Sequence, residues 1–368
     1  MKFVIEKDML QTNLGKIQGI AERKSTIPIL ANTLISGENN RISIVATDLE
    51  IGVMEITEAT KMEKGEICVS ARKFYDIIRE LPGDQIEVQK QENFWVSIKA
   101  GKTEFNLPGL DPKEFPAFPS TEGTSYFNID AQVLAEMIEK TVFAASSEES
   151  RFNLNGIYIE QATRDKKDYF RMVATDGHRL SMIEKEIKTT FEKGIIISRR
   201  GLTELKKILG DTEREITVSL EGNNCIFKTE QTTVVIRLLE GEYPDYHQVI
   251  PGANKKQVII DRREFIGALR RAQVIASEKG EGVKFFIQEE SMEIKTGGPD
   301  VGNVHEEIKV IYNGKPIEVS FNARYLLDVL NNIDTEKITV NLNEELSPGL
   351  IKPMDREDYL YVIMPMRI

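Results

Sequence analysis

Residues 173–180 of the chain read Val-Ala-Thr-Asp-Gly-His-Arg-Leu, and the first four of these residues also occur 128 positions earlier, at residues 45–48. A match of four residues is weak by itself, but the strand and helix patterns on both sides of it repeat as well. A long internal repeat would decide the number of domains, so the flanking patterns are the first test of it.

Three segments follow the same order of a short apolar strand, an acidic residue and an amphipathic helix. The acidic residues are Glu6, Asp130 and Asp261, and the predicted helices lie at residues 9–21, 133–145 and 265–276. An anion at the start of a helix is favoured by the unpaired N–H groups and by the helix dipole. We therefore expect each acidic residue to cap the helix after it.

Each copy also contains a second strand and helix, followed by an alternating strand at residues 85–88, 215–218 and 337–340. Alternation of apolar and polar residues indicates one buried face and one wet face. The sequence therefore predicts an α+β fold of three repeated domains, at residues 1–124, 125–253 and 254–368. The boundaries lie at the proline-containing stretches 108–119 and 244–251.

Charge and cysteine content limit the class of protein. The chain has 48 basic and 59 acidic residues, a net charge of -11, which by itself argues against a polyanionic partner. Cys68 and Cys225 belong to no CxxC pair, so we expect reduced thiols and a cytoplasmic protein. We expect no membrane association, because no apolar run approaches the roughly 20 residues of a membrane span. The N-terminus lacks the apolar region of a signal peptide.

The six predicted helices are more basic than the rest of the chain. Together they carry 18 basic and 11 acidic residues, so the remainder carries a net charge of -18. Basic residues seven positions apart lie on one side of a helix, about 10 Å from each other. Such pairs are Lys16/Arg23, Arg72/Arg79, Arg199/Lys206, Arg200/Lys207 and Arg263/Arg270. They are expected to face solvent, either as ordinary wet faces or as a surface that binds phosphates without reading bases.

Few residues suit catalysis. The chain has three histidines and no P-loop, GxGxxG, GxSxG, HExxH or CxxC pattern. Asp176 and His178 could form an acid–base or metal-binding pair, but a tight turn around Gly177 explains the same residues. We therefore predict no catalytic residue, no metal site and no cofactor.

The C-terminal residues 359–368 read Tyr-Leu-Tyr-Val-Ile-Met-Pro-Met-Arg-Ile, which is unusually apolar for a chain end. Residues 359–363 are predicted to form a last strand, which Pro365 ends. Met364, Met366 and Ile368 lie beside or beyond that proline. Methionine side chains suit apolar surfaces that adapt to several partners.

Several stretches together resemble the bacterial sliding clamp family, the beta subunit of DNA polymerase III. They are Ala-Thr-Asp-Gly-His-Arg-Leu at 174–180, Tyr-Pro-Asp-Tyr at 243–246, Met-Pro-Met-Arg at 364–367, Arg-Phe-Asn-Leu-Asn-Gly at 151–156 and Leu-Leu-Asp-Val-Leu-Asn at 326–331. The resemblance spans the whole chain, in order and at matching spacing.

The resemblance implies three clamp domains per chain, each with two helices and two antiparallel sheets. It also implies a head-to-tail homodimer that closes a six-domain ring, with helices lining the hole. Phe105, Val274 and Ile275 would then lie at the subunit interface. The basic helices would face double-stranded DNA, which the ring encircles without sequence specificity, and the implied DNA contacts are Lys24, Arg199 and Arg200.

The family also implies a groove between the second and third domains for short peptides of its partners. These are the alpha subunit of DNA polymerase III, the clamp loader, repair polymerases and other clamp-binding proteins. The groove positions map onto Leu154, Thr175, Gly177, His178, Arg179, Leu180, Pro244, Val249, Val362, Ile363, Met364, Pro365 and Met366. Gln248 stands where some members have a basic residue, so peptide preference can differ.

Two other classes stay open from the sequence. A repeat scaffold that binds peptides would keep the C-terminal groove but would lack the basic helix surface. A hydrolase would use Asp176 and His178. Encirclement of DNA, as the resemblance implies, would make the chain a processivity factor without catalytic activity of its own.

Overall fold

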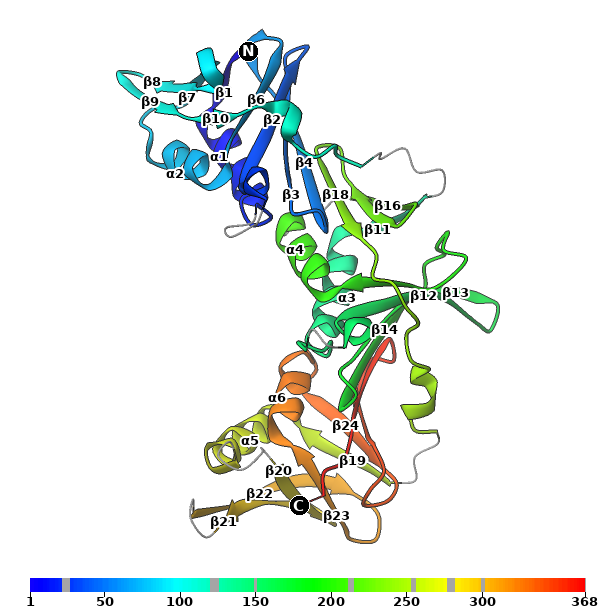
Figure 1. Ribbon diagram of the computed structural model, residues 1–368. Helices are drawn as coiled ribbons and strands as arrows, with labels where there is room; N and C mark the ends of the chain where they lie inside the picture. The colour runs from blue at the N-terminus through cyan, green and yellow to red at the C-terminus, as the bar shows by residue number, and fades with distance from the viewer. Residues whose placement is uncertain are drawn as a thin grey trace. The chain divides into compact units, whose positions relative to one another are not determined.

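Six α-helices occur in the part of the chain that the computed structural model describes, which is residues 1–21, 27–119, 126–148, 151–210, 215–252, 256–276, 282–298 and 302–367. Each lies where a helix pattern was predicted (Figure 1). Their bounds are α1 Lys7–Ile17, α2 Ala71–Glu80, α3 Ala131–Val142, α4 Arg199–Leu209, α5 Arg262–Ala276 and α6 Ala323–Asn331. The first helix is shorter than predicted, since it ends at Ile17 rather than at residue 21.

Acidic capping is confirmed for two of the three repeat helices. The Asp130 carboxylate accepts hydrogen bonds from the N–H groups of Gln132 and Val133, and Asp261 accepts one from Glu264. The prediction for Glu6 is wrong, because its side chain makes no capping bond to α1.

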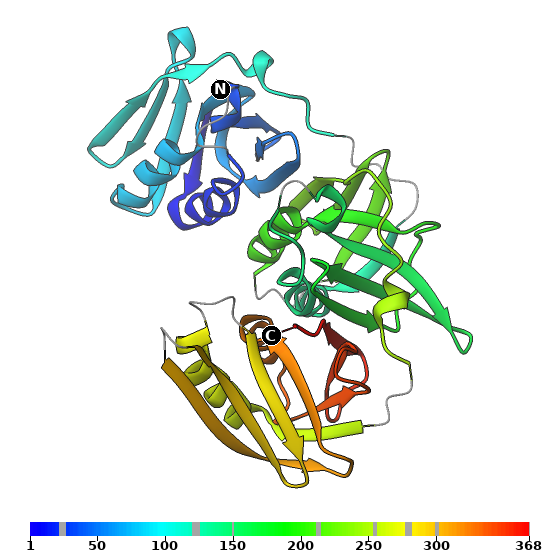
Figure 2. The ribbon, with the colours of Figure 1, turned by 60° about the horizontal axis from the view of Figure 1, so that its bottom comes forward.

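The chain forms two compact units, Met1–Ala135 with Arg200–Leu238, and Glu136–Arg199 with Leu239–Ile368. The second repeat is therefore divided between them. Within the first unit α1 packs beside α2, and within the second α5 packs beside α6. Figure 2 shows α5 against one face of the strands of the third repeat.

The first unit holds a five-stranded sheet in the order β5-β1-β7-β8-β9 and a nine-stranded sheet in the order β10-β6-β2-β3-β4-β18-β17-β16-β11. The strands are β1 Lys2–Glu6, β2 Asn32–Glu38, β3 Arg41–Thr47, β4 Ile51–Glu58, β5 Thr60–Glu63, β6 Gly65–Ser70, β7 Gln85–Lys90, β8 Val96–Ala100, β9 Thr103–Leu107, β10 Gly109–Leu110, β11 Tyr126–Asp130, β16 Glu215–Glu221, β17 Asn224–Lys228 and β18 Thr232–Arg237.

The second unit holds one twelve-stranded sheet in the order β15-β12-β13-β14-β26-β25-β24-β19-β22-β21-β20-β23. Its strands are β12 Gly156–Arg164, β13 Lys167–Thr175, β14 Arg179–Lys185, β15 Ile195–Ser198, β19 Lys256–Asp261, β20 Gly282–Gln288, β21 Ser291–Gly298, β22 Gly302–Tyr312, β23 Ile317–Asn322, β24 Lys337–Leu342, β25 Gly349–Pro353 and β26 Tyr359–Ile363. The predicted last strand is confirmed as β26.

All these strand pairs are antiparallel, and the alternating pattern holds for β7 and β16, where apolar residues are buried. It fails for β24, because Thr339 and Asn341 are buried as well as their apolar neighbours. Side chains on both faces of β24 are therefore covered by other parts of the chain.

Two strand pairs join one repeat to the next. The first joint is the pair β4·β18, and the second joint is the pair β14·β26 (Figure 1). Both pairs are antiparallel, and each lies wholly within one compact unit. The sheets therefore continue from repeat to repeat, which covers strand edges that would otherwise be open.

Five short 3₁₀ helices connect these elements in the described part of the chain. They are η1 Pro28–Ala31, η2 Glu92–Phe94, η3 Pro112–Glu114, η4 Phe152–Leu154 and η5 Tyr246–Val249. Of these, η4 and η5 carry predicted site residues. Among the described residues, no helix combines the length and apolar character of a membrane span.

Candidate functional site

The chain end after β26 is held by backbone hydrogen bonds on two sides. The N–H of Met364 donates to the carbonyl of His178 at 2.9 Å, and the N–H of Met366 donates to Ser320 at 2.8 Å. Pro365 lies between them and has no N–H to donate. Met364, Pro365 and Met366 are half-buried, so part of each side chain stays accessible.

An apolar cluster lies around the second joint. Leu180 and Val362 pair directly across β14 and β26, and both are buried. Val173, Leu350, Leu360 and Tyr246 complete the buried part of the cluster. Val249 packs against it and is only half-buried. The structure thus brings together three predicted groove residues from three separate segments.

Two further apolar groove candidates, Leu154 and Pro244, lie on segments that are connected by a hydrogen bond. Leu154 is half-buried at the end of η4, and Pro244 is exposed. The Asn153 amide donates to the carbonyl of Glu242 at 2.8 Å, which connects the Leu154 turn to the Pro244 segment. The Tyr158 and Tyr243 rings stack with centroids 5.1 Å apart and fix the same segment.

The turn between β13 and β14 is fully specified by its own hydrogen bonds. The Thr175 hydroxyl donates to the carbonyl of Arg179 at 2.6 Å, and the Asp176 carboxylate accepts the N–H groups of His178 and Arg179. Gly177 has φ +88°, a left-handed conformation that favours glycine. These bonds support the turn interpretation of Asp176 and His178. Among the described residues, no cluster of three or more His, Cys, Asp or Glu could hold a metal ion.

Arg179 is buried, and its guanidinium is used within the chain. It donates to Asp176 at 3.1 Å, to Asp328 at 2.5 Å and to the carbonyl of Phe143 at 2.8 Å. It also lies over the rings of Phe143 and Tyr325. The Arg179 side chain therefore connects β14 to α6 and lies against the turn that contains Asp176.

The exposed His178 ring stacks on Tyr325, with centroids 6.1 Å apart. The sequence analysis gave no site role to Tyr325, Asp328 or Ser320, although Asp328 lies within the motif at residues 326–331. Tyr325 and Asp328 belong to a helix pattern that was correctly predicted as α6, but nothing in that pattern shows which repeat the helix faces. Contacts across 140 or more residues depend on tertiary packing alone.

The segment before Val249 is anchored by a polar network. The Tyr246 hydroxyl donates to Glu160 at 2.5 Å and accepts from Arg171 at 2.9 Å. Burial raises the pKa of Tyr246, and the Glu160 carboxylate raises it further. The exposed Gln248 amide donates to Asp245 at 3.0 Å, and this bond, with one from His247, lowers the pKa of Asp245.

The candidate DNA contacts fall in different places. Lys24 and Arg23 lie outside the described residues. Arg199 is half-buried and Arg200 exposed, both at the start of α4, and Arg200 forms an ion pair with Asp48. The prediction that Lys16 faces solvent is wrong, because its amine binds Glu55 at 3.1 Å in the first joint.

The candidate interface residues lie on two elements. Phe105 is exposed on β9, the edge strand of the five-stranded sheet. On α5, Val274 is exposed and Ile275 is half-buried.

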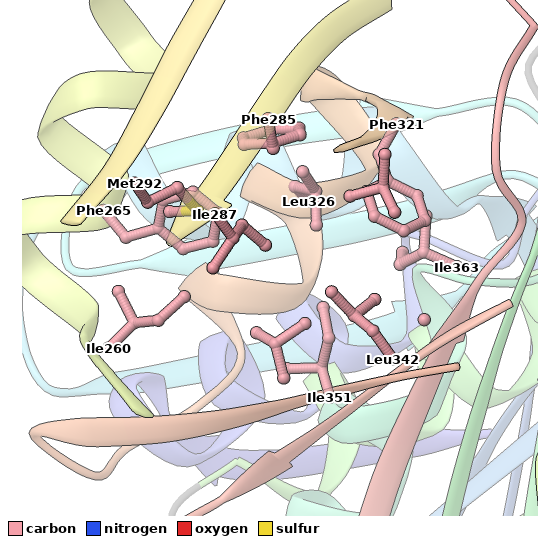
Figure 3. Close-up of a pocket in the computed structure, with 13 residues that line it drawn as sticks. Ile260, Phe265, Phe285, Ile287, Met292, Phe321, Leu326, Leu342, Ile351 and Ile363 are labelled. Atoms are coloured by element: carbon pink, nitrogen blue, oxygen red, sulfur yellow. The ribbon is translucent and has the colours of Figure 1, made fainter. Parts of the chain in front are cut away.

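A small cavity lies in the core of the third repeat, with Ile363 in its wall (Figure 3). Its volume is about 20 Å³, and its thirteen lining residues are all apolar or glycine. An apolar space of about one water volume is a packing gap and not a ligand site.

Comparison with known proteins covers the whole chain. Models of the N-terminal, central and C-terminal domains of the DNA polymerase III beta subunit match residues 1–119, 128–245 and 247–367. The chain is 33% identical over 371 residues to the beta sliding clamp of Pseudomonas aeruginosa and 31% identical over 370 residues to that of Vibrio cholerae. Each comparison covers 100% of both chains.

Solved structures give the same result. The crystal structure of the DNA polymerase III subunit beta from Pseudomonas aeruginosa matches with a TM-score of 0.94 at 32% identity. The sliding clamp from Bartonella birtlesii bound to griselimycin matches with a TM-score of 0.95 at 32% identity. Both comparisons cover 100% of this chain and of the other.

Proposed function

Because the chain belongs to the DNA polymerase III beta-subunit family of bacterial sliding clamps, we propose that it encircles duplex DNA as a head-to-tail homodimer. A sliding clamp serves DNA replication as a processivity factor and is not a catalyst. The proposed ring holds DNA by enclosure, so weak phosphate contacts suffice for it to slide without dissociating. A polymerase tethered to it sees its template at a high effective concentration.

The observation that carries the ring proposal is the repeated use of one strand pairing. β18 and β26 are each the third strand after the second helix of a repeat. Each pairs with a strand of the preceding repeat, β18 with β4 and β26 with β14. β9 has the same place in the first repeat but ends its sheet. In the third repeat, β22 corresponds to β4 and β14, and its residues 302–309 pair only with β21 among the described strands.

A pairing of β9 with β22 of a second copy would therefore repeat the two joints in trans. It would place Phe105 beside the partner's third repeat and would cover Val274 and Ile275 of α5. Two such joints close a ring of six domains, each with two helices, which in this proposal line the hole. The domains would be residues 1–124, 125–253 and 254–368, whose boundaries at residues 124 and 253–254 lie outside the described residues.

We also propose that the surface at the second joint binds linear peptides of the alpha subunit, the clamp loader, repair polymerases and other clamp-binding proteins. The apolar contacts would come from Leu154, Leu180, Val249, Val362 and Met364. The remaining groove positions would shape the wall or orient the peptide backbone, namely Thr175, Gly177, His178, Arg179, Pro244, Ile363, Pro365 and Met366. A buried apolar floor beside half-buried side chains suits anchor residues of a peptide.

The DNA-facing side would carry Lys24, Arg199 and Arg200, and contacts from this side would go to phosphates and read no bases. The chain would work in the cytoplasm, where DNA and the polymerase are located. Its acidic net charge is compatible with this role, because the proposed DNA contacts are on the more basic helices.

Encirclement is tested by retention on DNA. The clamp is loaded onto nicked circular DNA, which is then linearised, and bound clamp is measured before and after. We expect retention on the circle and loss from the free ends of the linear form. Equal retention on both would refute encirclement, and a mass of 41.8 kDa at all protein concentrations would refute the dimer.

The peptide surface is tested by deleting residues 364–368 and measuring binding of the polymerase alpha subunit. We expect binding to be lost while the dimer stays intact. His178→Ala should change peptide affinity only. Unchanged polymerase binding by the deletion variant would show that the groove lies elsewhere.

A further inference from the structure

The first joint holds a buried carboxylate against an exposed arginine of the proposed DNA-facing helices. The guanidinium of Arg200 is in ion-pair contact with the carboxylate of Asp48 and lies 4.0 Å from that of Glu50. The Arg200 side chain is 49% exposed, whereas that of Asp48 is 2% exposed. The pair thus has one buried and one accessible partner.

The position of Asp48 is fixed by the turn between β3 and β4. Its Oδ1 accepts the N–H groups of Glu50 at 3.0 Å and Ile51 at 2.7 Å. The Thr47 hydroxyl completes the turn by donating to the carbonyl of Ile51 and accepting from the N–H of Leu49. The carboxylate therefore cannot turn towards water without breaking these hydrogen bonds at the start of β4.

The other oxygen of Asp48 depends on Arg200. Oδ2 is buried and accepts no hydrogen bond from the described residues, so the nearby guanidinium is what compensates its charge. A buried carboxylate that loses its cation is strongly disfavoured. Transfer of Arg200 to a DNA phosphate would leave Asp48 in that state. The ion pair should therefore persist when DNA is in the ring.

The corresponding aspartate of the second repeat behaves differently. Asp176 makes the same turn, but its arginine partner is Arg179, which is buried and also bound to Asp328. Substitution of Asp176 would therefore release no cation to the surface, so Asp176 is a matched control for Asp48.

We propose that Asp48 limits the affinity of the clamp for DNA by keeping Arg200 from binding phosphate. This inference rests on the proposed function and deepens it, since Arg200 would face the DNA but would neutralise no phosphate while Asp48 holds it. Each phosphate that a protein neutralises steepens the dependence of log K on log salt by about 0.9. A clamp that must slide along DNA benefits when it neutralises few phosphates.

The test compares Asp48→Asn, Arg200→Gln, the double variant and Asp176→Asn as assembled clamps on nicked circular DNA. Asn at position 48 keeps Oδ1 for the two backbone N–H groups and removes the charge. We expect Asp48→Asn to bind duplex DNA several-fold more tightly at low salt, with a salt slope steeper by about 0.9, and to diffuse more slowly along it. Arg200→Gln should change affinity less than two-fold, and the double variant and Asp176→Asn should match the wild type.

Two results would overturn the proposal. One is an Asp48→Asn clamp that folds with unchanged affinity and salt slope. The other is a several-fold loss of affinity in Arg200→Gln, which would mean that Arg200 already binds phosphate in the wild type. If Asp48→Asn does not fold, the affinity of Arg200→Gln decides the question. Arg200→Gln should fold, because the Arg200 side chain is half-exposed. Failure of the proposed function is separate, since it appears as wild-type clamp that stays on linearised DNA.

Discussion

The two joints of the chain share one backbone plan and hold different side chains. In the first joint Glu55 pairs with Thr232, and in the second Ile183 pairs with Tyr359 at the same place in the strands. A lysine from the first helix of the first repeat, and one from the first helix of the second repeat, lie against these pairs. The two lysines, Lys16 and Lys140, lie at corresponding positions of α1 and α3.

The lysines meet different partners. Lys16 binds the Glu55 carboxylate at 3.1 Å and the Thr232 hydroxyl at 3.3 Å. Lys140 lies over the Tyr359 ring and donates to Asp334 at 2.5 Å and to the carbonyl of Asn332 at 2.6 Å. Glu55 is 1% exposed, whereas Asp334 is 63% exposed. The first joint thus buries an acid, and the second keeps its acid in water.

The two joints also differ in the side chains beside their last backbone hydrogen bond. The N–H of Arg237 donates to the carbonyl of Glu50 just as Met364 donates to His178. Where the second joint has Leu180, the first has Gly52, which is covered by Phe118. Corresponding backbone bonds therefore build both joints, and a few side chains make the second joint more apolar than the first.

The largest difference should appear when the lysines are removed. Lys16→Met leaves the buried Glu55 without its cation and should cost about 3–5 kcal/mol of unfolding free energy, the usual range for breaking a buried pair. Lys140→Met should cost less, because Asp334 can be solvated. Urea unfolding of both variants measures the difference.

A matched rescue sharpens this test. Glu55→Ile in the Lys16→Met background recreates the apolar pairing of the second joint and should restore most of the lost stability. Equal destabilisation by Lys16→Met and Lys140→Met would show that burial of the acid does not distinguish the joints.

The second prediction exchanges surface residues between the joints. His178→Glu together with Met364→Arg gives the second joint the charges of the first. Peptide affinity should fall about 50- to 100-fold, near the roughly 2–3 kcal/mol of an interface hot spot. Fluorescence anisotropy with a labelled peptide of the polymerase alpha subunit measures it. The reverse exchange, Glu50→His with Arg237→Met, should create no binding, since Phe118 still covers Gly52; peptide binding there would contradict this account.

The third prediction concerns acid. Burial raises the pKa of Glu55 above its ordinary 4.5, although Thr232 and Lys16 oppose the shift. A raised pKa contributes stability that is complete below the ordinary value and is lost as pH rises through the folded value. Burial would also raise the pKa values of Glu136 and Asp358 in the second joint, but bonds from Lys185 and Arg356 hold both below the ordinary range.

Those two carboxylates contribute stability above their ordinary pKa values and lose it as pH falls through the folded values. Acidification below about pH 4.5 should therefore loosen the second joint more than the first. Hydrogen exchange of β14 and β26 against β4 and β18, corrected for intrinsic rates, measures this. Glu136→Gln should reduce the effect, and equal loosening of both joints would count against it.

The sequence predicted the repeat well, for a local reason. Strand and helix patterns depend on the spacing of apolar residues such as Leu202 and Leu205 of α4, and burial confirms them. The chain end was also predictable, because Pro365 marks where pairing must stop. The three-domain fold followed from these patterns alone, and the resemblance to a family agreed with it.

The charged residues were less predictable. Lys16 and Arg200 share a spacing pattern with solvated pairs, and only the fold shows that Lys16 binds Glu55 and that Arg200 meets Asp48. The same holds for Tyr325, which reaches His178 across 147 positions. Helical spacing places a side chain on one side of its helix but does not identify the repeat that lies opposite.

The smallest effect should come from the two turns themselves. Gly177 and Leu49 occupy the same turn position, with φ of +88° and +75°. Gly177→Ala forces a Cβ into the left-handed region and should cost about 1 kcal/mol, and this Cβ would meet Arg151 at 3.4 Å. Leu49→Gly relieves the same strain but gives the unfolded chain more freedom, so its net effect should stay below about 0.5 kcal/mol. Urea midpoints compare the two, and a neutral Gly177→Ala would show that the second turn tolerates a side chain as the first one does.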